Sequence, residues 1–526
     1  MRLFRSAAYC FALVLPLLSC VVAVAQDHPD TPPAKASASS IDAKSDALPP
    51  LPADASVAQT VTVGGKILHY TASVGVIPVY DRTDPAKPEV KTGEVVVTSY
   101  TLDGVGDHGA AAGNGAAAGN VDRPVTFAMN GGPGASSVYL NLGAIGPRHI
   151  QFAGQGDSPS DPPRLTDNPG TWLPFSDLVF IDPIGTGFSR SLVSPAETKK
   201  MFYSTTPDIE YLSRVIYDWL VKNGRLQSRK YLIGESYGGY RGPRVTHYLQ
   251  SQLGVAMNGV VLVSPYLNPW IEGNGEISPL PWMMSLPSIA AAHLEREHQL
   301  DGEHMASVIA YTRGEYVTDL LAGRSNPEAT PRIIKNVTEM TGLDPAFVKY
   351  SGGRIEIGAY LREVHRERGE IGSVYDSNVT APDPFPFSPE GKGNDPILEA
   401  IIAPTTTAMV DWVTRVVGWK TTARYNALSY DVNEAWDRDK VLERGSTSDL
   451  RQAVAADPKM RVLIAHGWDD LSCPFMGSVL TVDEMPLMGD PARVAVHEYP
   501  GGHMFYTRAA SQASFVKDVE AMIAAH

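Results

Sequence analysis

Six short apolar runs, each ending where Gly, Pro or Asp begins or in a polar segment, constrain the fold of this chain most strongly. Apolar runs of this length are typical of strands that are buried on both faces of a sheet. Helical patterns at residues 209–221 and 237–253 separate some of these runs. Strands that alternate with helices predict an α/β fold with a mostly parallel central sheet and helices on both faces. The predicted strands are VTFAM (125–129), LVFID (178–182), KYLIG (230–234), GVVLVS (259–264), RVLIAHG (461–467) and RVAVHEY (493–499).

The alternation of strands and helices is interrupted between residues 270 and 457. This stretch contains charged amphipathic segments such as HLEREHQL and YLREVHRERGE, which predict an insertion made mainly of helices. The chain has 526 residues, whereas an ordinary domain has roughly 100–200 residues. We therefore expect one large α/β domain, formed by residues 57–269 and 458–526, with a cap insertion at 270–457.

The first 25 residues have the pattern of an export signal peptide. Two arginines precede an apolar run that ends near Val24, and small residues stand at the expected cleavage site after Ala25. A membrane anchor is one alternative, which Pro16 within the apolar run disfavours. Lipoprotein processing at Cys20 is another, disfavoured because the apolar run continues past this cysteine. We expect an exported protein, periplasmic or secreted, without stable membrane insertion.

Residues 26–56 are rich in Pro, Ala, Ser and Asp and poor in large apolar side chains, so they predict a disordered linker. A second segment of this kind, Asp103–Asn120, lies between two strand-like runs and is expected to form a long loop. Removal of the signal peptide takes away Cys10 and Cys20 and leaves Cys473 alone. The mature chain therefore has no intramolecular disulfide and depends on its hydrophobic core.

The charge balance and the motif content exclude several classes of function. With 44 basic and 58 acidic residues the formal charge is −14, which disfavours a nucleic-acid partner. Phosphate-binding and dinucleotide-binding glycine motifs are missing after the predicted strands, and His293 and His298 are five residues apart, on different faces of a helix. We expect no cofactor and no metal site. Nothing in the sequence specifies self-association.

The pentapeptide Gly234-Glu235-Ser236-Tyr237-Gly238 is a G-x-S-x-G motif. It follows the predicted strand KYLI and opens a predicted helix, which is the setting of a nucleophile elbow. With 47 glycines in the chain the letters alone could match by chance, so the strand and helix around the motif carry the prediction. Such a turn presents the serine hydroxyl above the sheet.

A serine nucleophile needs an imidazole to accept its proton and a carboxylate to orient that imidazole. Beyond the motif, one predicted strand runs into Asp469 and Asp470, and the next runs into two glycines and His503. Both loops follow carboxyl ends of strands, where open α/β sheets form their sites. His503 is the expected base, whereas His466 and His497 lie in strand patterns and are expected to be structural. These patterns leave the choice between the two aspartates open.

Acyl transfer also needs two backbone N–H donors that stabilise the oxyanion. Tyr237, directly after the nucleophile, is expected to supply one of them. The glycine-rich loop Asn130–Gly134, directly after the strand VTFAM, is expected to supply the other, because its glycines allow close approach to the reacting carbonyl.

Five segments together resemble the serine carboxypeptidase family of α/β-hydrolases. The resemblance implies an α/β-hydrolase fold in which the insertion forms the family's variable cap over the site. These segments are NGGPGASS (130–137), IDPIGTGFS (181–189), GESYGGYRGP (234–243), HGWDDLSCP (466–474) and GGHMFY (501–506).

The resemblance also implies roles for individual residues. Ser236 is the nucleophile, His503 is the base, and Asp470 is the triad carboxylate because the family's G-x-x-D motif ends on it. The implied oxyanion donors are Gly132 and Tyr237, and the residues implied to bind the substrate's terminal carboxylate are Asn130 and Glu235.

Members of this family release C-terminal residues from peptides. Glu235 can donate a hydrogen bond to a carboxylate only when it is protonated, and a nearby like charge would raise its pKa, so we expect better activity below neutral pH. Two positions depart from the family pattern. Ala128 stands where the family commonly has Trp, and Ala144 stands where it commonly has Glu before a Gly-Pro pair. The carboxylate-binding set is therefore smaller than usual.

The sequence thus predicts a serine carboxypeptidase whose partner is a peptide with a free C-terminus. Ser236 attacks the C-terminal peptide carbonyl, His503 transfers the proton, and water releases the acyl-enzyme. An esterase or acyltransferase with the same triad is one alternative, because the pocket and cap decide the substrate. A non-catalytic binding protein of the same fold is another, disfavoured because all three triad residues are present. Cys473 is expected to be a small buried side chain.

Overall fold

The structure is a computed structural model that describes residues 48–82, 88–104, 121–152, 154–268, 277–387, 395–438 and 445–525. The predicted signal peptide, most of the linker, and residues 105–120 of the predicted long loop lie outside the described residues. Residues from Pro50 onward belong to one compact unit. No helix among the described residues combines the length and the apolar character needed to cross a membrane.

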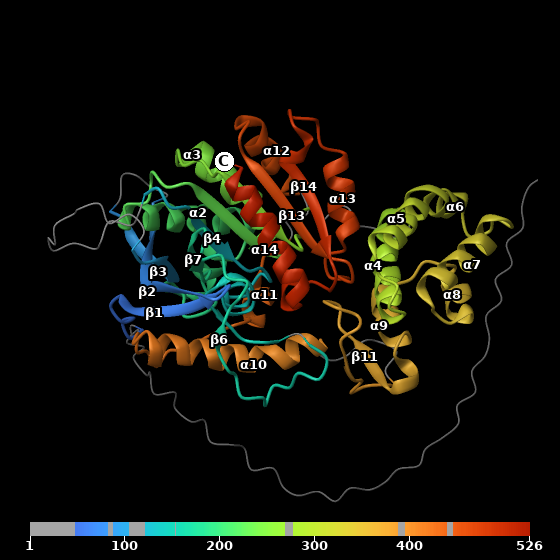
Figure 1. Ribbon diagram of the computed structural model, residues 1–526, viewed down its shortest axis with the longest axis horizontal. Helices are drawn as coiled ribbons and strands as arrows, with labels where there is room; N and C mark the ends of the chain where they lie inside the picture. Colours follow the sequence, from blue (N-terminus) through green and yellow to red (C-terminus); the bar gives the residue numbers. More distant parts are fainter. Residues whose placement is uncertain are drawn as a thin grey trace, which may run out of the picture. The chain divides into compact units, whose positions relative to one another are not determined.

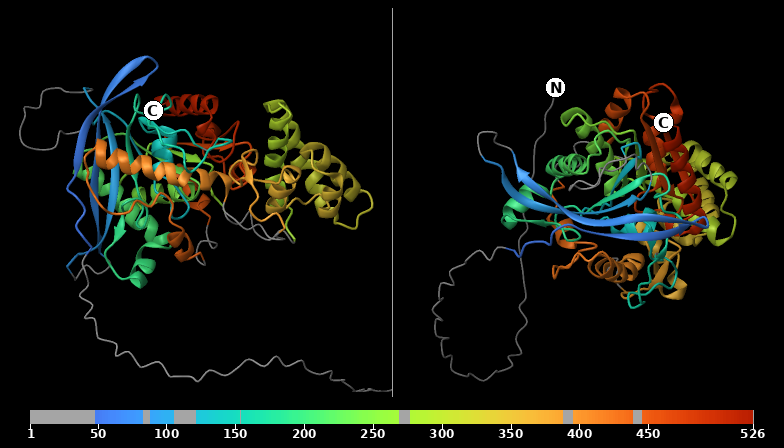
Figure 2. Two further views of the ribbon diagram at one scale, coloured as in Figure 1. Left: turned by 90° about the horizontal axis from the view of Figure 1, so that it is seen from below. Right: turned by 60° about the vertical axis from the view of Figure 1, so that its left-hand side comes forward.

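A ten-stranded sheet forms the centre of this unit (Figure 1). Strands β7, β4, β9, β10, β13 and β14 are parallel neighbours, and β1, β2 and β3 add an antiparallel ribbon at one edge, drawn in blue in Figure 2. The order is β1-β2-β3-β7-β4-β9-β10-β13-β14, with β8 paired to β3. The strand bounds are β1 Ala55–Val63, β2 Lys66–Asp81, β3 Val90–Leu102, β4 Val125–Met129, β7 Asp177–Ile181, β8 Arg190–Ser191, β9 Lys230–Glu235, β10 Gly259–Val263, β13 Arg461–Gly467 and β14 Val494–Tyr499.

All six predicted strands are present in the parallel part of this sheet, each within one residue of its predicted ends. Helices cover both faces of the sheet. Successive residues of a strand point to opposite faces, so each parallel strand contributes side chains to both cores. In β4, Phe127 packs into the core on one face and Ala128 into the core on the other. The α/β-hydrolase fold with a mostly parallel sheet is thereby confirmed.

One core contains residues of helices α2, α3 and α12, and the other contains residues of η1, α10 and α14. The predicted helices 209–221 and 237–253 correspond to α2 and α3. The bounds of these helices are α2 Thr205–Lys222, α3 Tyr237–Gln252, α12 Thr447–Ala456, η1 Tyr139–Ile145, α10 Pro396–Asp411 and α14 Ala509–Ala524.

The stretch predicted as a cap insertion contains two kinds of structure. Helices between residues 280 and 363 enclose a hydrophobic core of their own, followed by the short hairpin β11–β12. Helices α10 and α12, in contrast, pack into the two cores of the sheet, and Trp412 and Trp419 belong to one of these cores. The elements of the first group are α4 Leu280–Arg296, α5 Gly302–Tyr311, η2 Thr312–Tyr316, α6 Val317–Ala322, α7 Ala329–Thr341, α8 Pro345–Ser351, α9 Ile357–Glu363, η3 Arg366–Arg368, β11 Glu370–Gly372 and β12 Thr380–Pro382.

The ordered structure starts slightly before the predicted end of the linker at residue 56. Strand β1 begins at Ala55, and Asp54 accepts a hydrogen bond from the backbone N–H of Val76 at 3.1 Å and one from Lys222 Nζ at 2.5 Å. The apolar and polar residues of β1 alternate, so one face of the strand packs against the hydrophobic core and the other faces solvent. The remaining described elements are β5 Arg148–His149, β6 Thr166–Asp167, α1 Pro195–Phe202, η4 Trp412–Val416, α11 Tyr430–Ala435, α13 Phe475–Asp483, η5 Pro491–Arg493 and η6 Phe505–Thr507.

Candidate active site

Ser236 occupies the sharp turn between β9 and α3. Its backbone has φ 59° and ψ −121°, a conformation that costs energy for a residue with a side chain. The flanking glycines have no room for a side chain: a Cβ on Gly234 would lie 2.1 Å from the Gly238 oxygen, and one on Gly238 would lie 2.3 Å from the Met129 oxygen. The geometry is that of the predicted nucleophile elbow.

His503 and Asp470 are brought together from the loops after β14 and β13. The distance from His503 Nδ1 to Asp470 Oδ2 is 2.8 Å, and the exposed fractions of the two side chains are 3% and 0%. The other Asp470 oxygen accepts hydrogen bonds from the backbone N–H groups of Ser472 and Cys473. Burial alone would lower the pKa of His503, but the charge and hydrogen bond of Asp470 raise it above its ordinary value of 6.5.

The end of β10 connects the histidine loop to the nucleophile turn. The Ser236 N–H donates to the Val263 oxygen at 3.0 Å, and the next residue, Ser264, donates from its hydroxyl to the His503 oxygen at 2.8 Å. Within the described part of the chain, no hydrogen bond joins the Ser236 hydroxyl to His503. Such hydrogen bonds often tighten only when the substrate binds, so the triad is a proposal that the geometry supports.

The cap insertion also holds the two triad loops. The His503 N–H donates to the Tyr375 oxygen at 2.6 Å, and the Leu471 N–H donates to the Val374 oxygen at 3.1 Å. The ring of Tyr375 meets the imidazole edge-on, with 5.1 Å between the ring centroids. Two adjacent residues of the insertion thus accept hydrogen bonds from both loops: Val374 from the loop of Asp470 and Tyr375 from the loop of His503.

A cavity of about 340 Å³ opens beside Ser236, and both predicted oxyanion donors, Gly132 and Tyr237, line it. The glycine-rich loop lies directly on the nucleophile turn, because a Cβ on Gly131 would be 2.4 Å from the Tyr237 nitrogen. Gly132 has φ +99°, which favours glycine. The loop thus places two backbone segments against one another where the oxyanion of an acyl intermediate would form.

Asn130 and Glu235 also lie together, as predicted for a carboxylate-binding pair. Asn130 Nδ2 donates to Glu235 Oε2 at 2.7 Å, and the hydroxyl of Tyr506 lies 3.0 and 2.9 Å from the two Glu235 oxygens. Neither Asn130 nor Glu235 is among the described residues that line the 340 Å³ cavity. The carboxylate pair is therefore not part of the cavity wall.

Burial raises the pKa of Glu235 to about 7. The sequence predicts such a rise from a nearby like charge, whereas in the structure desolvation is the main cause and the charge of Asp470 is a minor one. Glu235 is 3% exposed. The contact of Tyr506 with Glu235 is not predicted by the sequence, although Tyr506 lies three residues after His503 in the segment GGHMFY.

The two positions that depart from the family pattern are apolar core positions. Ala128 is fully buried in β4, and Ala144 is 1% exposed in η1. The Ala144 oxygen accepts hydrogen bonds from Asn168 and Gln512. Neither alanine side chain can hydrogen-bond to a substrate carboxylate, so Asn130 and Glu235 are the predicted polar groups that remain.

The other predicted non-catalytic residues also have structural surroundings. His466 is buried with Nε2 2.8 Å from the Ser478 hydroxyl, and burial lowers its pKa to about 3. His497 Nδ1 lies 3.0 Å from Asp518 Oδ2. Cys473 is 6% exposed, as expected for a small buried side chain, but it also lines the cavity beside Ser236. His293 lies in α4.

Asp469, the aspartate next to the triad, belongs to a separate carboxyl cluster with Glu295 and Asp376. Oxygens of the three carboxyl groups lie within 4.8 Å of one another, which is close enough to hold a metal ion. Among the described residues, this is the one cluster with such spacing. Arg508 already supplies a positive charge there: it pairs closely with Glu295, and its Nη2 lies 2.7 Å from Asp376 Oδ2 and 3.8 Å from Asp469 Oδ2. Burial and the neighbouring carboxylates raise the pKa of Asp469 well above its ordinary value. We therefore interpret the cluster as a structural link between α4 and the triad loops.

A buried ion pair between Arg241 and Asp208 is hydrogen-bonded to the loop of Asn130. Arg241 Nε lies 2.6 Å from Asp208 Oδ2, with exposed fractions of 1% and 0%, and Arg241 Nη1 donates to the Asn130 oxygen at 2.9 Å. Replacing Arg241 by Met leaves Asp208 buried without its partner, so we expect the free energy of unfolding to fall by about 3–5 kcal/mol. Urea titration measures this change.

The matched control for this prediction is the double variant Arg241→Met with Asp208→Leu. It removes the uncompensated charge as well, and we expect it to regain most of the lost stability. A single variant within about 1 kcal/mol of the parent protein would contradict the prediction, because that is the range of an exposed ion pair.

Comparisons with known proteins agree with this geometry. Residues 115–326 match the family model described as serine carboxypeptidase. The pheromone-processing carboxypeptidase KEX1 of Saccharomyces cerevisiae (strain ATCC 204508 / S288c) is 35% identical over 127 residues, which cover 23% of this chain and 16% of that protein. Serine carboxypeptidase-like 9 of Arabidopsis thaliana is 27% identical over 178 residues, which cover 32% of this chain and 38% of that protein. The chain thus spans well under half the length of these curated relatives.

Among solved structures, the proline iminopeptidase of Mycobacterium smegmatis has a TM-score of 0.33 at 13% identity and covers 89% of this chain and 99% of its own. The homoserine O-acetyltransferase of Bacillus anthracis has a TM-score of 0.35 at 12% identity and covers 86% and 97%. The strand order and the nucleophile elbow of this chain define its α/β-hydrolase fold. The family match spans the glycine-rich loop and the Ser236 elbow, so this part of the chain is similar to the serine carboxypeptidase family.

Proposed function

We propose that this protein is an exported serine carboxypeptidase that releases C-terminal residues from peptides. The observation that carries the proposal is the buried pair of Asn130 and Glu235 beside the Ser236 elbow, with a Glu235 pKa of about 7. A simple esterase has no need of a protonated carboxyl group at this place. The family match over residues 115–326 and the names of the curated relatives also support a serine carboxypeptidase.

The proposed reaction follows from the positions of these residues. His503 takes the proton of the Ser236 hydroxyl while the oxygen attacks the last peptide carbonyl. Asp470 holds the imidazole through Nδ1, so the other ring nitrogen faces the reaction. The N–H groups of Gly132 and Tyr237 stabilise the oxyanion. His503 then protonates the leaving amine, and a water molecule that it deprotonates hydrolyses the acyl-enzyme.

The terminal carboxylate of the substrate is proposed to bind at Asn130 and Glu235. A neutral Glu235 donates its proton in a hydrogen bond to that carboxylate, whereas an ionised Glu235 repels it. Tyr506 holds the Glu235 carboxyl group in place with a hydroxyl 2.9–3.0 Å from both of its oxygens. Binding of the substrate carboxylate therefore depends on the protonation state of one buried side chain.

We expect the KM for a blocked dipeptide with a free C-terminus to rise as the pH increases through about 7. Glu235 has a raised pKa, so its proton is present below this pH and is lost above it. Above pH 7 each further pH unit should raise KM by roughly ten-fold until another contact limits the effect. Steady-state kinetics between pH 5 and 9 (about two units on either side of that pKa) measure the profile.

Glu235→Gln is the control for this pH profile, because the amide always donates and never ionises. The variant should flatten the rise of KM without moving the pH dependence that His503 gives to kcat. A profile that is the same in the parent protein and in Glu235→Gln would assign the pH dependence to another group.

The function itself is tested by comparing a blocked dipeptide that has a free C-terminus with its C-terminal amide and with a simple ester. A carboxypeptidase should cleave the free acid with a kcat/KM higher by about 10²-fold, since only the acid engages Asn130 and Glu235. Equal or faster turnover of the amide or the ester would instead support the esterase or acyltransferase alternative.

Export is tested separately by N-terminal sequencing of the protein from the extracytoplasmic fraction. The proposal expects the mature chain to begin at Gln26, directly after the predicted cleavage site. A chain that begins at a lipid-modified Cys20 would support lipoprotein processing, and an intact N-terminus in the membrane fraction would support an anchor.

A further inference from the structure

The cavity beside Ser236 has one charged residue among the described residues that line it, and this residue is Arg438. The other lining groups are backbone and uncharged side chains, including the rings of Tyr266 and Trp436. A cavity of about 340 Å³ is large enough for one or two amino-acid side chains. A single cation in such a cavity selects its occupant by charge.

The guanidinium group of Arg438 is held in place relative to the nucleophile. Nη1 donates to the Asn433 backbone oxygen and Nη2 donates to the Asn433 Oδ1, both at 2.7 Å. Asn433 in turn donates from Nδ2 to the Pro133 oxygen at 2.9 Å, in the loop that carries Gly132. This chain of hydrogen bonds ties the cation to the predicted oxyanion loop.

Arg438 still has capacity for a ligand. A guanidinium has five N–H donors, and Asn433 uses two of them. In the part of the chain that the structure describes, Arg438 makes no ion pair with an acidic side chain. The planar guanidinium matches a carboxylate with two parallel hydrogen bonds, which is the strongest contact it makes.

The position of the cavity decides which part of the substrate it receives. The scissile carbonyl must lie at Ser236, and its oxygen must face Gly132 and Tyr237. Asn130 and Glu235, which are proposed to hold the terminal carboxylate, do not line the cavity. We therefore place the C-terminal residue at Asn130 and Glu235, outside the cavity, and infer that the cavity receives the side chain of the residue before it, whose carbonyl Ser236 attacks.

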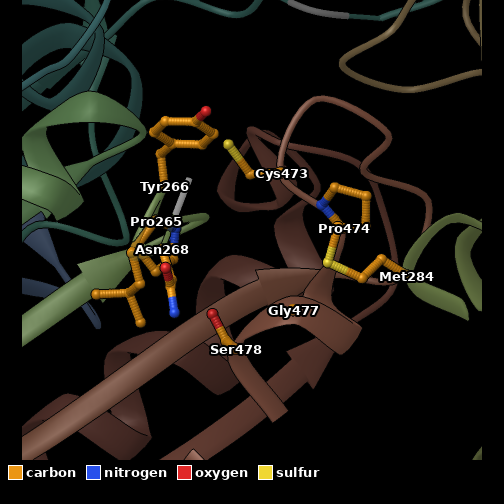
Figure 3. A pocket seen from close by; sticks show the side chains of 9 residues that line it. Pro265, Tyr266, Asn268, Met284, Cys473, Pro474, Gly477 and Ser478 are labelled. Carbon is orange, nitrogen blue, oxygen red and sulfur yellow. The ribbon is translucent and has the colours of Figure 1, made fainter. Parts of the chain in front are cut away.

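The walls of the cavity favour an apolar stem on this side chain. The ring of Trp436 meets that of Tyr237 edge-on, with 5.6 Å between their centroids. Figure 3 shows the ring of Tyr266 beside the sulfur of Cys473, and these two residues line both the cavity and the smaller pocket of that view. Glutamate has methylene groups for this wall and a carboxylate for the cation.

We propose that Arg438 makes this site selective for peptides with an acidic side chain, glutamate above all, in the residue whose carbonyl is attacked. The proposal rests on the proposed acyl chemistry at Ser236. It adds a substrate class to that chemistry: peptides with an acidic penultimate residue.

The test compares blocked dipeptides that differ only in the penultimate residue: Glu, Gln or Lys followed by Leu. Glu and Gln have the same shape, so their ratio isolates the charge. The parent protein should prefer Glu over Gln by about ten-fold in kcat/KM, and Lys should be the poorest of the three. Raising the ionic strength from about 0.1 to about 1 M should reduce the ratio, because the site is partly open to solvent.

Arg438→Gln should bring the Glu-to-Gln ratio close to one, and Arg438→Glu should make the Lys peptide the best substrate. The matched control is Arg366→Gln, which removes an arginine with a 71% exposed side chain from the surface of the insertion. It should leave the ratio as in the parent protein. Equal turnover of Glu and Gln peptides by the parent protein, or a preference that survives in Arg438→Gln, would overturn the proposal.

Esters of blocked Glu and blocked Gln separate this proposal from the proposed function. They place the same side chain in the cavity but have no terminal carboxylate for Asn130 and Glu235. A Glu preference on esters that depends on Arg438, together with no cleavage of free dipeptides, would retain the selectivity and reject the carboxypeptidase. Cleavage of dipeptides without a charge preference would do the reverse.

Discussion

Replacing Ser236 by Ala is expected to lower kcat by about 10⁶-fold, the loss found when the nucleophile of a serine triad is removed. The substitution deletes the only atom that the proposed mechanism joins covalently to the substrate. Substrate binding and stabilisation of the oxyanion remain in the variant, and they should keep its rate about 10³–10⁴-fold above that of the uncatalysed reaction in water. Stopped assays with a blocked dipeptide, extended over days, measure the residual rate.

A fluorophosphonate probe gives a second readout of the same substitution. The parent protein should form one covalent adduct, and Ser236→Ala should form none. The matched control is Ser213→Ala, since Ser213 is also buried and its hydroxyl has no hydrogen-bond partner among the described residues. An adduct that persists in Ser236→Ala, or a parent protein that is never labelled, would reject the proposed nucleophile.

The second large effect is expected at Asp470. Asp470→Asn should lower kcat by about 10⁴-fold, because an amide facing His503 Nδ1 favours the wrong tautomer of the imidazole. Asp469→Asn is the control, and it should change kcat by only a few-fold. Burial and neighbouring carboxylates favour the protonated form of Asp469, which an asparagine resembles in shape and charge.

Both aspartate variants should be compared at one pH by kcat and by thermal unfolding. Asp470→Asn should lose rate while the fold is retained, since Asp470 Oδ1 still accepts from the N–H groups of Ser472 and Cys473 in the amide form. If Asp469→Asn were the slower enzyme, Asp469 would have to be the orienting carboxylate, against the 2.8 Å contact between His503 and Asp470.

Much of the fold could be predicted from the sequence because the parallel strands are buried on both faces. Mostly apolar runs such as 125–129 and 461–467 are typical of buried strands, and Asn130 and Gly467 mark where these two runs end. The role of α10 could not be predicted in this way. Its helical pattern lies inside a long insertion, and only the structure shows that Ile401 and Met409 pack into the core of the sheet.

The candidate site was predictable where a motif fixes a backbone shape, as at Ser236 and Gly132. It was less predictable where a long-range contact decides a role. Asp469 and Asp470 are adjacent in sequence, and their different roles come from His503 on one side and Arg508 on the other. The environment of Glu235 likewise depends on Tyr506, which lies 271 residues away along the chain.

The hydrogen bonds from residues 374 and 375 to the two triad loops limit how this protein can be re-engineered or can evolve. An exchange of the whole helical insertion for one from a relative would also replace the backbone acceptors of Leu471 and His503. Grafts that alter substrate range should therefore keep residues 373–378 and vary the helices between 280 and 363. Amide hydrogen exchange at Leu471 and His503 should report opening of the insertion, because both protons become exposed when that segment leaves.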